Sequence, residues 1–262
     1  MIWEFTDDEF KVLCNRYLDG WMPVPLAYTS RTELYDDYQR ELAALEPQLQ
    51  ERISAGLSAV FEVVRDPEVF VISSAWCDSD VDNPDKRIRV HGAQRGHRAV
   101  MITMTPGETI YHSRGFTVTE CEPSELPGLI GAQLPTADAA RGPSVPIVVE
   151  PQERDPYEVR QSFAFDSFDD SNDALSLAFW NRPAEWTGFV RVLQGRSIYG
   201  PRGVLETTVL WRDLPGDGRY VIDLDETEMR AVGMSTQQLV DHIAGRVERV
   251  LQHMEARGEE LV

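Results

Sequence analysis

The sequence predicts one α+β domain over residues 1–262, with helices near both ends of the chain and short strands between them. Apolar residues recur at spacings of three and four near both termini, which is the pattern of amphipathic helices. Short β-rich segments bounded by turn residues fill each half, as in a strand meander. The same order of helices and strands occurs before and after a proline-rich crossing segment, which divides the chain into pseudo-halves at about 1–134 and 145–262. This repeat reflects either an ancient duplication or the element order that α+β meanders commonly share.

The first helix is predicted by its start, because Thr6 and Glu9 form a capping box. The segment 22–28 holds two prolines and is expected to be an extended segment at a sheet edge. A second helical stretch runs from about residue 32 to residue 53, and Pro47 is expected to kink or divide it.

Strands are predicted where β-rich runs end in turn residues. Two of them are joined by Gly216-Asp217-Gly218, a strong hairpin signal. Helices are expected from about residue 124 and over 174–180. The expected strands are 69–76, 88–93, 99–104, 109–112, 117–121, 147–149, 188–193, 204–214 and 219–224.

A closing helix begins at Ser235, where Gln238 completes a second capping box. Its apolar stripe is wide, so we expect a core-facing centre and exposed margins. Arg246, Arg249 and Met254 are placed at the outward margin. The stripe consists of Leu239, Val240, Ile243, Val247, Val250, Leu251 and Met254.

Composition and charge exclude several classes of protein. The formal net charge of −19 argues against binding to nucleic acid or to anionic membranes, because both need clustered Lys and Arg. No window approaches the ~20 apolar residues of a membrane span, and the N-terminus lacks the features of a signal peptide. We therefore expect a cytoplasmic protein without membrane insertion. Cys14, Cys77 and Cys121 show no CxxC spacing, which indicates neither a disulfide framework nor a zinc site.

Asp78, Asp80 and Asp82 begin like a calcium-binding loop. The sixth and twelfth positions hold Asn83 and Arg89, however, where that loop needs glycine and a bidentate glutamate. We interpret the segment as a solvated acidic loop between two strands, and we expect no cofactor.

An enzymatic alternative remains open at this level. Cys121 and His112 could form a nucleophilic pair, since such partners meet in space rather than in sequence. The segment 195–202 has two glycines of a phosphate loop without its Lys and Ser/Thr. Asp166, Asp169, Asp170 and Asp173 fit the start of a helix better than paired carboxylates. The alternative function is therefore a cysteine- or carboxylate-dependent hydrolase or transferase.

Aromatic residues crowd the stretch 163–186. They form either ordinary core or part of a groove for a protein partner, because aromatic side chains concentrate where interfaces carry their energy. The residues are Phe163, Phe165, Phe168, Phe179, Trp180 and Trp186.

The whole chain resembles the EspG family of type VII (ESX) secretion-associated chaperones of mycobacteria and related actinobacteria. Near the N-terminus the similar residues are Phe5-Thr6-Asp7-Asp8-Glu9-Phe10 and Met22-Pro23-Val24-Pro25-Leu26. In the C-terminal third they are the glycine-rich turn 195–200 with Arg202, Val209-Leu210-Trp211-Arg212-Asp213 and Asp217-Gly218-Arg219-Tyr220-Val221. Two features depart from the family pattern: the glycine pair of the strand turn is stretched, and the segment around Trp180 does not match.

The resemblance implies a central twisted antiparallel sheet with packed helices, quasi-two-fold related halves and a C-terminal helical region. It also implies a chaperone that covers the hydrophobic tip of the PPE subunit of a PE–PPE dimer until the secretion machinery takes it. In the family the partner meets a strand-to-strand loop of the first half and the C-terminal helices, here 76–86 and 235–254. The implied site residues are Trp76, Asp78, Asp80, Val81, Asp82, Gln238, Asp241, His242, Arg246, Arg249 and Met254.

An immunity-type protein that neutralises a toxin is a further alternative, because such proteins are also acidic and catalytically silent. Self-association of the free protein stays open. A PE–PPE gene pair beside this gene would favour the chaperone.

Overall fold

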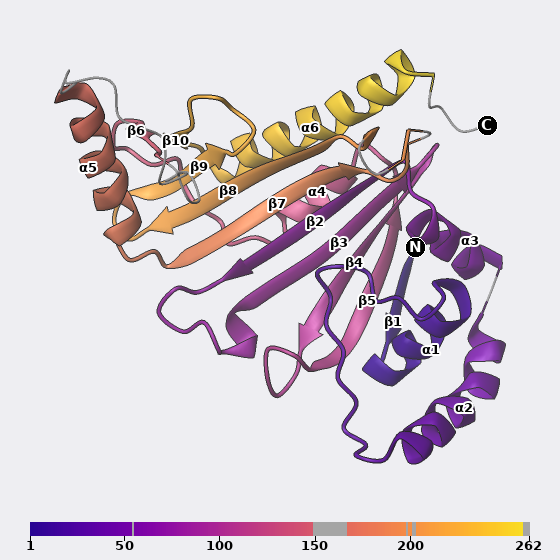
Figure 1. The fold of residues 1–262 in the computed structure, drawn as a ribbon. Helices are drawn as coiled ribbons and strands as arrows, with labels where there is room; N and C mark the ends of the chain where they lie inside the picture. The colour runs from indigo at the N-terminus through magenta and orange to yellow at the C-terminus, as the bar shows by residue number, and fades with distance from the viewer. Residues whose placement is uncertain (54, 149–166, 198, 201–202, 259–262) are drawn as a thin grey trace, which may run out of the picture.

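A computed structural model describes residues 1–53, 55–148, 167–197, 199–200 and 203–258. Its dominant feature is one large twisted sheet of ten antiparallel strands, with helices packed against it (Figure 1). The strand order is β1-β5-β4-β3-β2-β7-β8-β9-β10-β6. The α+β class and the central antiparallel sheet are therefore confirmed.

The first half of the chain forms one side of this sheet and most of its helices. Its elements are β1 (Ile2–Phe5), α1 (Asp7–Tyr17), α2 (Tyr35–Arg52), α3 (Ala55–Arg65), β2 (Val69–Trp76), the 3-10 turn η1 (Pro84–Lys86), β3 (Arg87–Arg95), β4 (Arg98–Pro106), β5 (Ser113–Cys121) and α4 (Leu126–Gly131). The elements of the second half are β6 (Val145–Pro146), α5 (Ser167–Asn181), β7 (Trp186–Gln194), β8 (Glu206–Leu214), β9 (Gly218–Asp223), β10 (Arg230–Gly233) and α6 (Thr236–Ala256).

The strand order is symmetric about the central pair β2–β7. Strands β3, β4 and β5 follow β2 outward as β8, β9 and β10 follow β7, and β1 and β6 close the two edges. The central strands run antiparallel over their whole length, from Val69 opposite Gln194 to Trp76 opposite Thr187. This order agrees with the quasi-two-fold relation that the resemblance implies.

The two faces of the sheet are covered differently. Helices α4 and α6 pack on one face, where fully buried Trp211, Leu239 and Ile243 belong to the same core cluster. On the opposite face α1, α2 and α3 lie at the β5 end, and Phe10 of α1 stacks on Phe116 at 4.3 Å. Helix α5 stands on that same face at the far end, beyond β9 and β10 (Figure 1). The candidate site lies on the part of this face between the two groups of helices.

Both predicted capping boxes are present. The Thr6 hydroxyl accepts from the Glu9 amide while the Glu9 carboxylate accepts from the Thr6 amide, and Ser235 and Gln238 repeat this arrangement at the start of α6. Of the two outcomes expected at Pro47, a kink or a division of the second helical stretch, the structure excludes the division there. Helix α2 contains Pro47 and ends at Arg52, and α3 begins after it.

The strand predictions are confirmed for most of the meanders, wrong at three segments, and miss two strands. The run 109–112 forms the turn between β4 and β5. A hydrogen bond from the Gly107 amide to the His112 carbonyl closes this turn. The segment 22–28 is not a strand, because its cis Val24–Pro25 bond and a turn bend the chain. The predicted strand 147–149 lies two residues earlier, as β6. The edge strand β1 and the short β10 were not predicted.

Candidate partner-binding site

The loop between β2 and β3 is closed on itself by hydrogen bonds. The Cys77 amide donates to the Lys86 carbonyl at 3.3 Å, and the Asp80 and Asn83 amides close two further turns. The Arg87 guanidinium donates to the Val81 carbonyl at 2.8 Å and lies 5.9 Å from the centre of the Trp76 ring. Val81 itself is 42% exposed at the tip. The loop therefore presents an apolar side chain from a fixed backbone.

The acidity of this loop is largely compensated by cations. Asp80 binds Lys86 at 3.0 Å, and hydrogen bonds from Asn83 and Lys86 lower the pKa of the Asp80 carboxyl. Asp85 pairs with Arg114 at 3.6 Å. Among the described residues, no group of three His, Cys, Asp or Glu side chains is placed to hold a metal ion. The arrangement is that of a folded recognition loop.

Arg212 of β8 fixes the base of the loop. Its guanidinium is buried and donates to Asp78 at 3.3 Å. It also donates to the Phe179 and Arg182 carbonyls at 2.9 and 2.8 Å, at the C-terminal end of α5. A cation there satisfies carbonyls that a helix leaves without partners. Arg212 thus connects the loop, the sheet and α5.

Beside the loop, an apolar strip crosses the central strands on the face opposite α6. We define this strip as Trp76, Phe189 and Leu210, with Phe70 farther along β2. All four side chains are half-buried. Trp76 and Phe189 meet edge-on with ring centres 6.5 Å apart, and Phe189 lies opposite Leu210 in the sheet register. Their alternation with Val71, Val190 and other residues of the α6 core places them on the face opposite α6, where Leu210 packs against the α5 core cluster and Ile72 is buried.

The predicted residues of α6 divide into exposed and buried groups. Gln238, Asp241 and Arg249 are exposed, and His242 is half-buried with Nε2 3.7 Å from Asp223. Burial lowers the pKa of His242.

The placement of Arg246 and Met254 at an outward margin is wrong. Arg246 is buried and forms ion pairs with Asp223 and Asp225, while Met254 is 6% exposed within the α6 core. Both lie on the face of α6 that packs against the sheet, because that face is wider than the core-facing centre predicted for the apolar stripe.

The structure does not bring the two predicted segments into one cluster. In the described part of the chain no hydrogen bond or ion pair joins the loop 77–86 to α6, which lies on the other face of the sheet. The apolar strip is instead the neighbour of the loop. Sequence reasoning missed the strip, because it depends on the pairing of β2 with β7.

The cysteine-based alternative has no geometric support. Cys121 ends β5 and His112 precedes its first residue, so about 27 Å of extended strand separates them. Burial raises the pKa of the Cys121 thiol to about 11, and that of Cys14 to about 12, which disfavours the reactive thiolate. The His112 ring is hydrogen-bonded to Thr109. The hypothesis of a Cys121–His112 pair is therefore wrong.

The aromatic stretch is only partly described. Phe163, Phe165 and Asp166 lie outside the described residues, as do Arg202 of the glycine-rich turn and the side chain of Phe168. Phe179 is buried against Tyr220 in a core cluster, and Trp180 is 38% exposed. The part that can be followed is thus mainly core.

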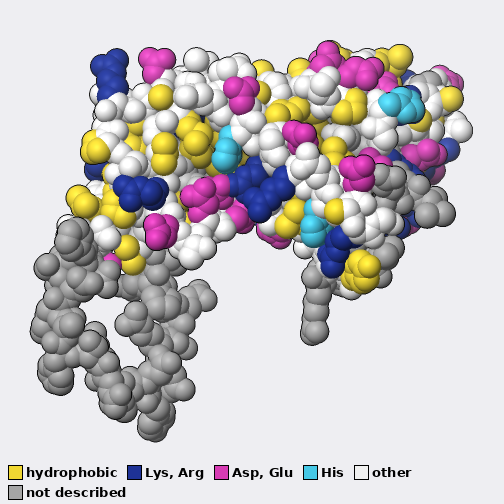
Figure 2. Space-filling view, turned by 90° about the horizontal axis from the view of Figure 1, so that it is seen from above, with side chains coloured by type: hydrophobic (Ala, Val, Ile, Leu, Met, Phe, Trp, Pro, Cys, Tyr) yellow, Lys and Arg dark blue, Asp and Glu magenta, His cyan; other side chains and the backbone are white. Residues whose placement is uncertain are grey.

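On the face that Figure 2 shows, acidic, basic and hydrophobic side chains of the described residues lie side by side. None of the helices in the described part of the chain combines the length and apolarity that a membrane crossing needs.

A model of the EspG family matches residues 6–245, and the chain therefore belongs to the EspG family. No curated protein sequence matches the chain. Among solved structures, the chain is similar to the Mycobacterium tuberculosis type VII secretion system chaperone EspG5, solved in complex with the PE25–PPE41 dimer. The two share 14% sequence identity with a TM-score of 0.56, over 97% of this chain and 96% of that chain. At this identity the likeness establishes a shared fold.

Proposed function

We propose that this chain is a cytoplasmic chaperone of a type VII secretion system. It binds a PE–PPE dimer at the hydrophobic tip of the PPE subunit and holds the dimer soluble until the secretion machinery takes it. The observation that carries this proposal is the half-exposed apolar strip beside a pre-folded loop, in a chain of the EspG family.

The proposed interface has the composition that binding requires. An exposed apolar tip on a secreted protein favours aggregation, so a chaperone needs a matching apolar surface with a polar rim. The strip supplies the apolar centre. The Arg191–Glu206 ion pair lies along one side, and the loop acids with their cations lie at the end. A rigid sheet beneath the strip keeps the entropic cost of binding low.

The proposed site retains the predicted loop and adds the strip. Trp76 joins the two, because it ends β2 and contacts Phe189. The exposed predicted residues of α6 remain candidates on the other face, whereas Arg246 and Met254 support the helix from within.

Two exposed valines allow a matched test. The chain is co-expressed with the PE–PPE pairs of its own genome, and complexes are detected by size-exclusion chromatography and quantified by titration calorimetry. Val81→Glu places a charge on the loop, where we expect at least about a tenfold loss of affinity, about 1.4 kcal/mol. Val232→Glu places the same charge on β10, where valine is 40% exposed, and affinity should be retained.

Three results are informative. Absence of any complex with the wild-type chain contradicts the chaperone function. Equal binding by both variants retains the function and removes the loop from the site. A loss confined to Val81→Glu supports the site as proposed.

A further inference from the structure

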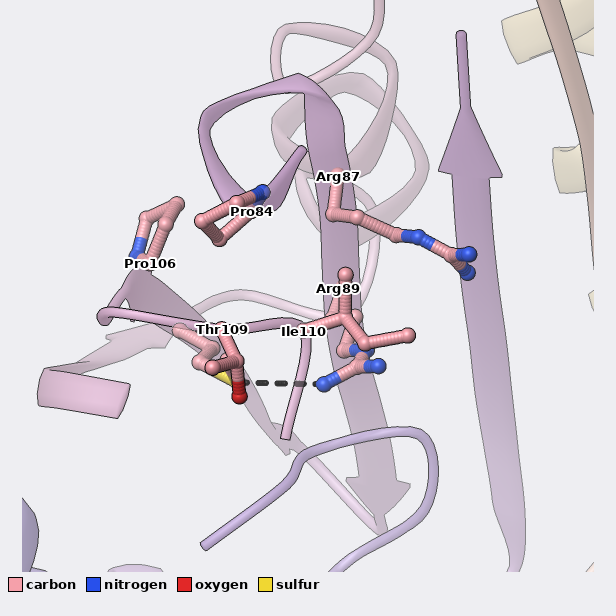
Figure 3. Close-up of a pocket in the computed structure, with 7 residues that line it drawn as sticks. Pro84, Arg87, Arg89, Pro106, Thr109 and Ile110 are labelled. Atoms are coloured by element: carbon pink, nitrogen blue, oxygen red, sulfur yellow. Dashed lines mark hydrogen bonds between the residues drawn. The ribbon is translucent and has the colours of Figure 1, made fainter. Parts of the chain in front are cut away.

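Arg89 of β3 lies in a small hollow beside the β2–β3 loop without an oxygen partner. Its guanidinium contacts the Met104 sulfur at 3.8 Å, and a thioether is a weak acceptor (Figure 3). No carboxylate or carbonyl of the described residues accepts a hydrogen bond from it. The hollow has a volume of about 10 Å³, room for about one water molecule, and is lined by Pro84, Arg87, Arg89, Met104, Pro106, Thr109 and Ile110.

The other arginines of the described residues that are not exposed differ from Arg89 in having an oxygen partner. Seven besides Arg89 are not exposed, and each of them binds an oxygen atom. Their partners are the Val81 carbonyl for Arg87, Asp66 for Arg95, Glu120 for Arg98, Glu206 for Arg191, Asp78 for Arg212, Asp213 for Arg219 and Asp225 for Arg246. Sheltering a charge without a counter-charge is costly, so Arg89 is an exception that needs a reason.

The environment of Arg89 favours an incoming anion. Burial and the neighbouring Arg87 charge lower the pKa of Arg89, although a guanidinium stays protonated at neutral pH. The walls around it are apolar, with two prolines and an isoleucine. The hollow has room only for the anionic end of a ligand, so a hydrocarbon stem would lie against the outer edge of these walls. A guanidinium presents a planar fork that matches a carboxylate with two hydrogen bonds.

We propose that Arg89 receives the carboxylate of a Glu or Asp side chain of the bound protein partner. This inference rests on the proposed function, since Pro84 belongs to the end of the recognition loop. A protein-borne carboxylate is favoured over a free anion, because a chain with a net charge of −19 does not concentrate small anions from solution. Arg89 is thus a specificity residue that selects partners with an acidic residue at this position.

The test compares Arg89→Met with Arg95→Met. Arg95 is also half-buried on β3, but it already pairs with Asp66 at 3.4 Å. Affinity for the PE–PPE dimer should fall on the order of 30-fold in Arg89→Met, since losing one partner of a desolvated charge pair has at least that effect. Arg95→Met should bind nearly as the wild type does. The melting temperature of Arg89→Met should equal or exceed that of the wild type. Arg89→Gln is measured in parallel, so that a packing defect in one variant does not decide the result.

A second arm separates failure of this inference from failure of the proposed function. The melting temperature is recorded in glutarate, in phosphate and in chloride at equal ionic strength. If the wild type binds a dimer and both Arg89 variants bind it equally well, the inference is overturned. If no dimer is bound, the proposed function fails, and the glutarate measurement alone tests the hollow. A melting temperature that glutarate raises in the wild type but not in Arg89→Met then supports a carboxylate site. An equal change of the melting temperature in both proteins overturns it. Stabilisation by phosphate but not by glutarate overturns the choice of a carboxylate.

Discussion

Replacing Arg219 by methionine is expected to lower the free energy of unfolding by ~3–5 kcal/mol, because a buried carboxylate loses its cation. Arg219 is fully buried, and the Asp213 side chain is 9% exposed. Two hydrogen bonds of 2.7 Å join the guanidinium to the two carboxylate oxygens. Methionine keeps much of the apolar stem, so the loss is mainly electrostatic.

The same guanidinium connects strand β8, the crossing between the two halves and the start of α6. It lies 4.4 Å from the centre of the Trp211 ring and donates to the Pro135 carbonyl at 2.8 Å and the Thr236 hydroxyl at 3.1 Å. Thr236 is the first residue of α6. Both acceptors keep another donor, since the Ala137 amide donates to the Thr236 hydroxyl at 2.9 Å and that hydroxyl lies 3.4 Å from the Pro135 carbonyl, so the uncompensated Asp213 charge dominates the expected loss.

Urea unfolding of Arg219→Met, Asp213→Leu and the double variant measures the effect. Because replacing both partners by apolar groups removes the uncompensated charge, the double variant should recover about 2 kcal/mol or more relative to Arg219→Met. A single-variant loss below about 1 kcal/mol would refute the reasoning, and so would a double variant whose loss equals the sum of the single losses.

Four further outcomes follow from the packing and the buried groups. Ile243→Ala should cost ~2–5 kcal/mol in urea unfolding, since Ile243 is 1% exposed in the α6 core. Met254→Glu should lower the melting temperature strongly and weaken partner binding only in proportion to unfolding. Asp78→Ala should cost ~1–3 kcal/mol by depriving buried Arg212 of its carboxylate, whereas a substitution at exposed Asp82 should change stability by less than about 0.5 kcal/mol. His91 is 6% exposed, and burial lowers its pKa to about 4. The unfolded chain therefore binds the proton first, and stability falls as pH drops from about 6.5 toward 4. His91→Leu should flatten this part of the pH profile, and an unchanged slope would contradict the assignment.

Local signals in the sequence were sufficient for the elements that local chemistry determines. The capping boxes at Thr6 and Ser235 located two helix starts to the residue. The glycines flanking Asp217 located a hairpin, and both have positive φ in the structure, 74° at Gly216 and 130° at Gly218. The signal for Arg246 was also present, since it lies three residues after Ile243 and four before Val250, on the apolar face.

Long-range pairing explains what the sequence could not predict. Strand β1 has four residues, and it exists because Ile2 pairs with Thr119 across the chain. The run 109–112 has β-forming residues but connects two strands that pair with each other, so it must turn. The apolar strip needs β2 beside β7, whose paired residues Val69 and Gln194 lie far apart in sequence. Side chains that alternate along one strand do not reveal which strand lies next to it.

The symmetry of the sheet explains why the strip is open. The closing helices of the two halves, α4 and α6, meet on one face and cover the central strands there together. On the other face each half keeps its preceding helices at its own outer end, with α1, α2 and α3 over β3, β4 and β5, and α5 beyond β8. No helix of the described residues therefore crosses the seam β2–β7 on that face, where Ile72 is 3% exposed and Trp76 and Phe189 are half-buried. Under the proposed function, a partner with an apolar tip completes the core at the seam and contacts both halves at once. Its binding should then stabilise the pairing of the halves as well as the partner itself.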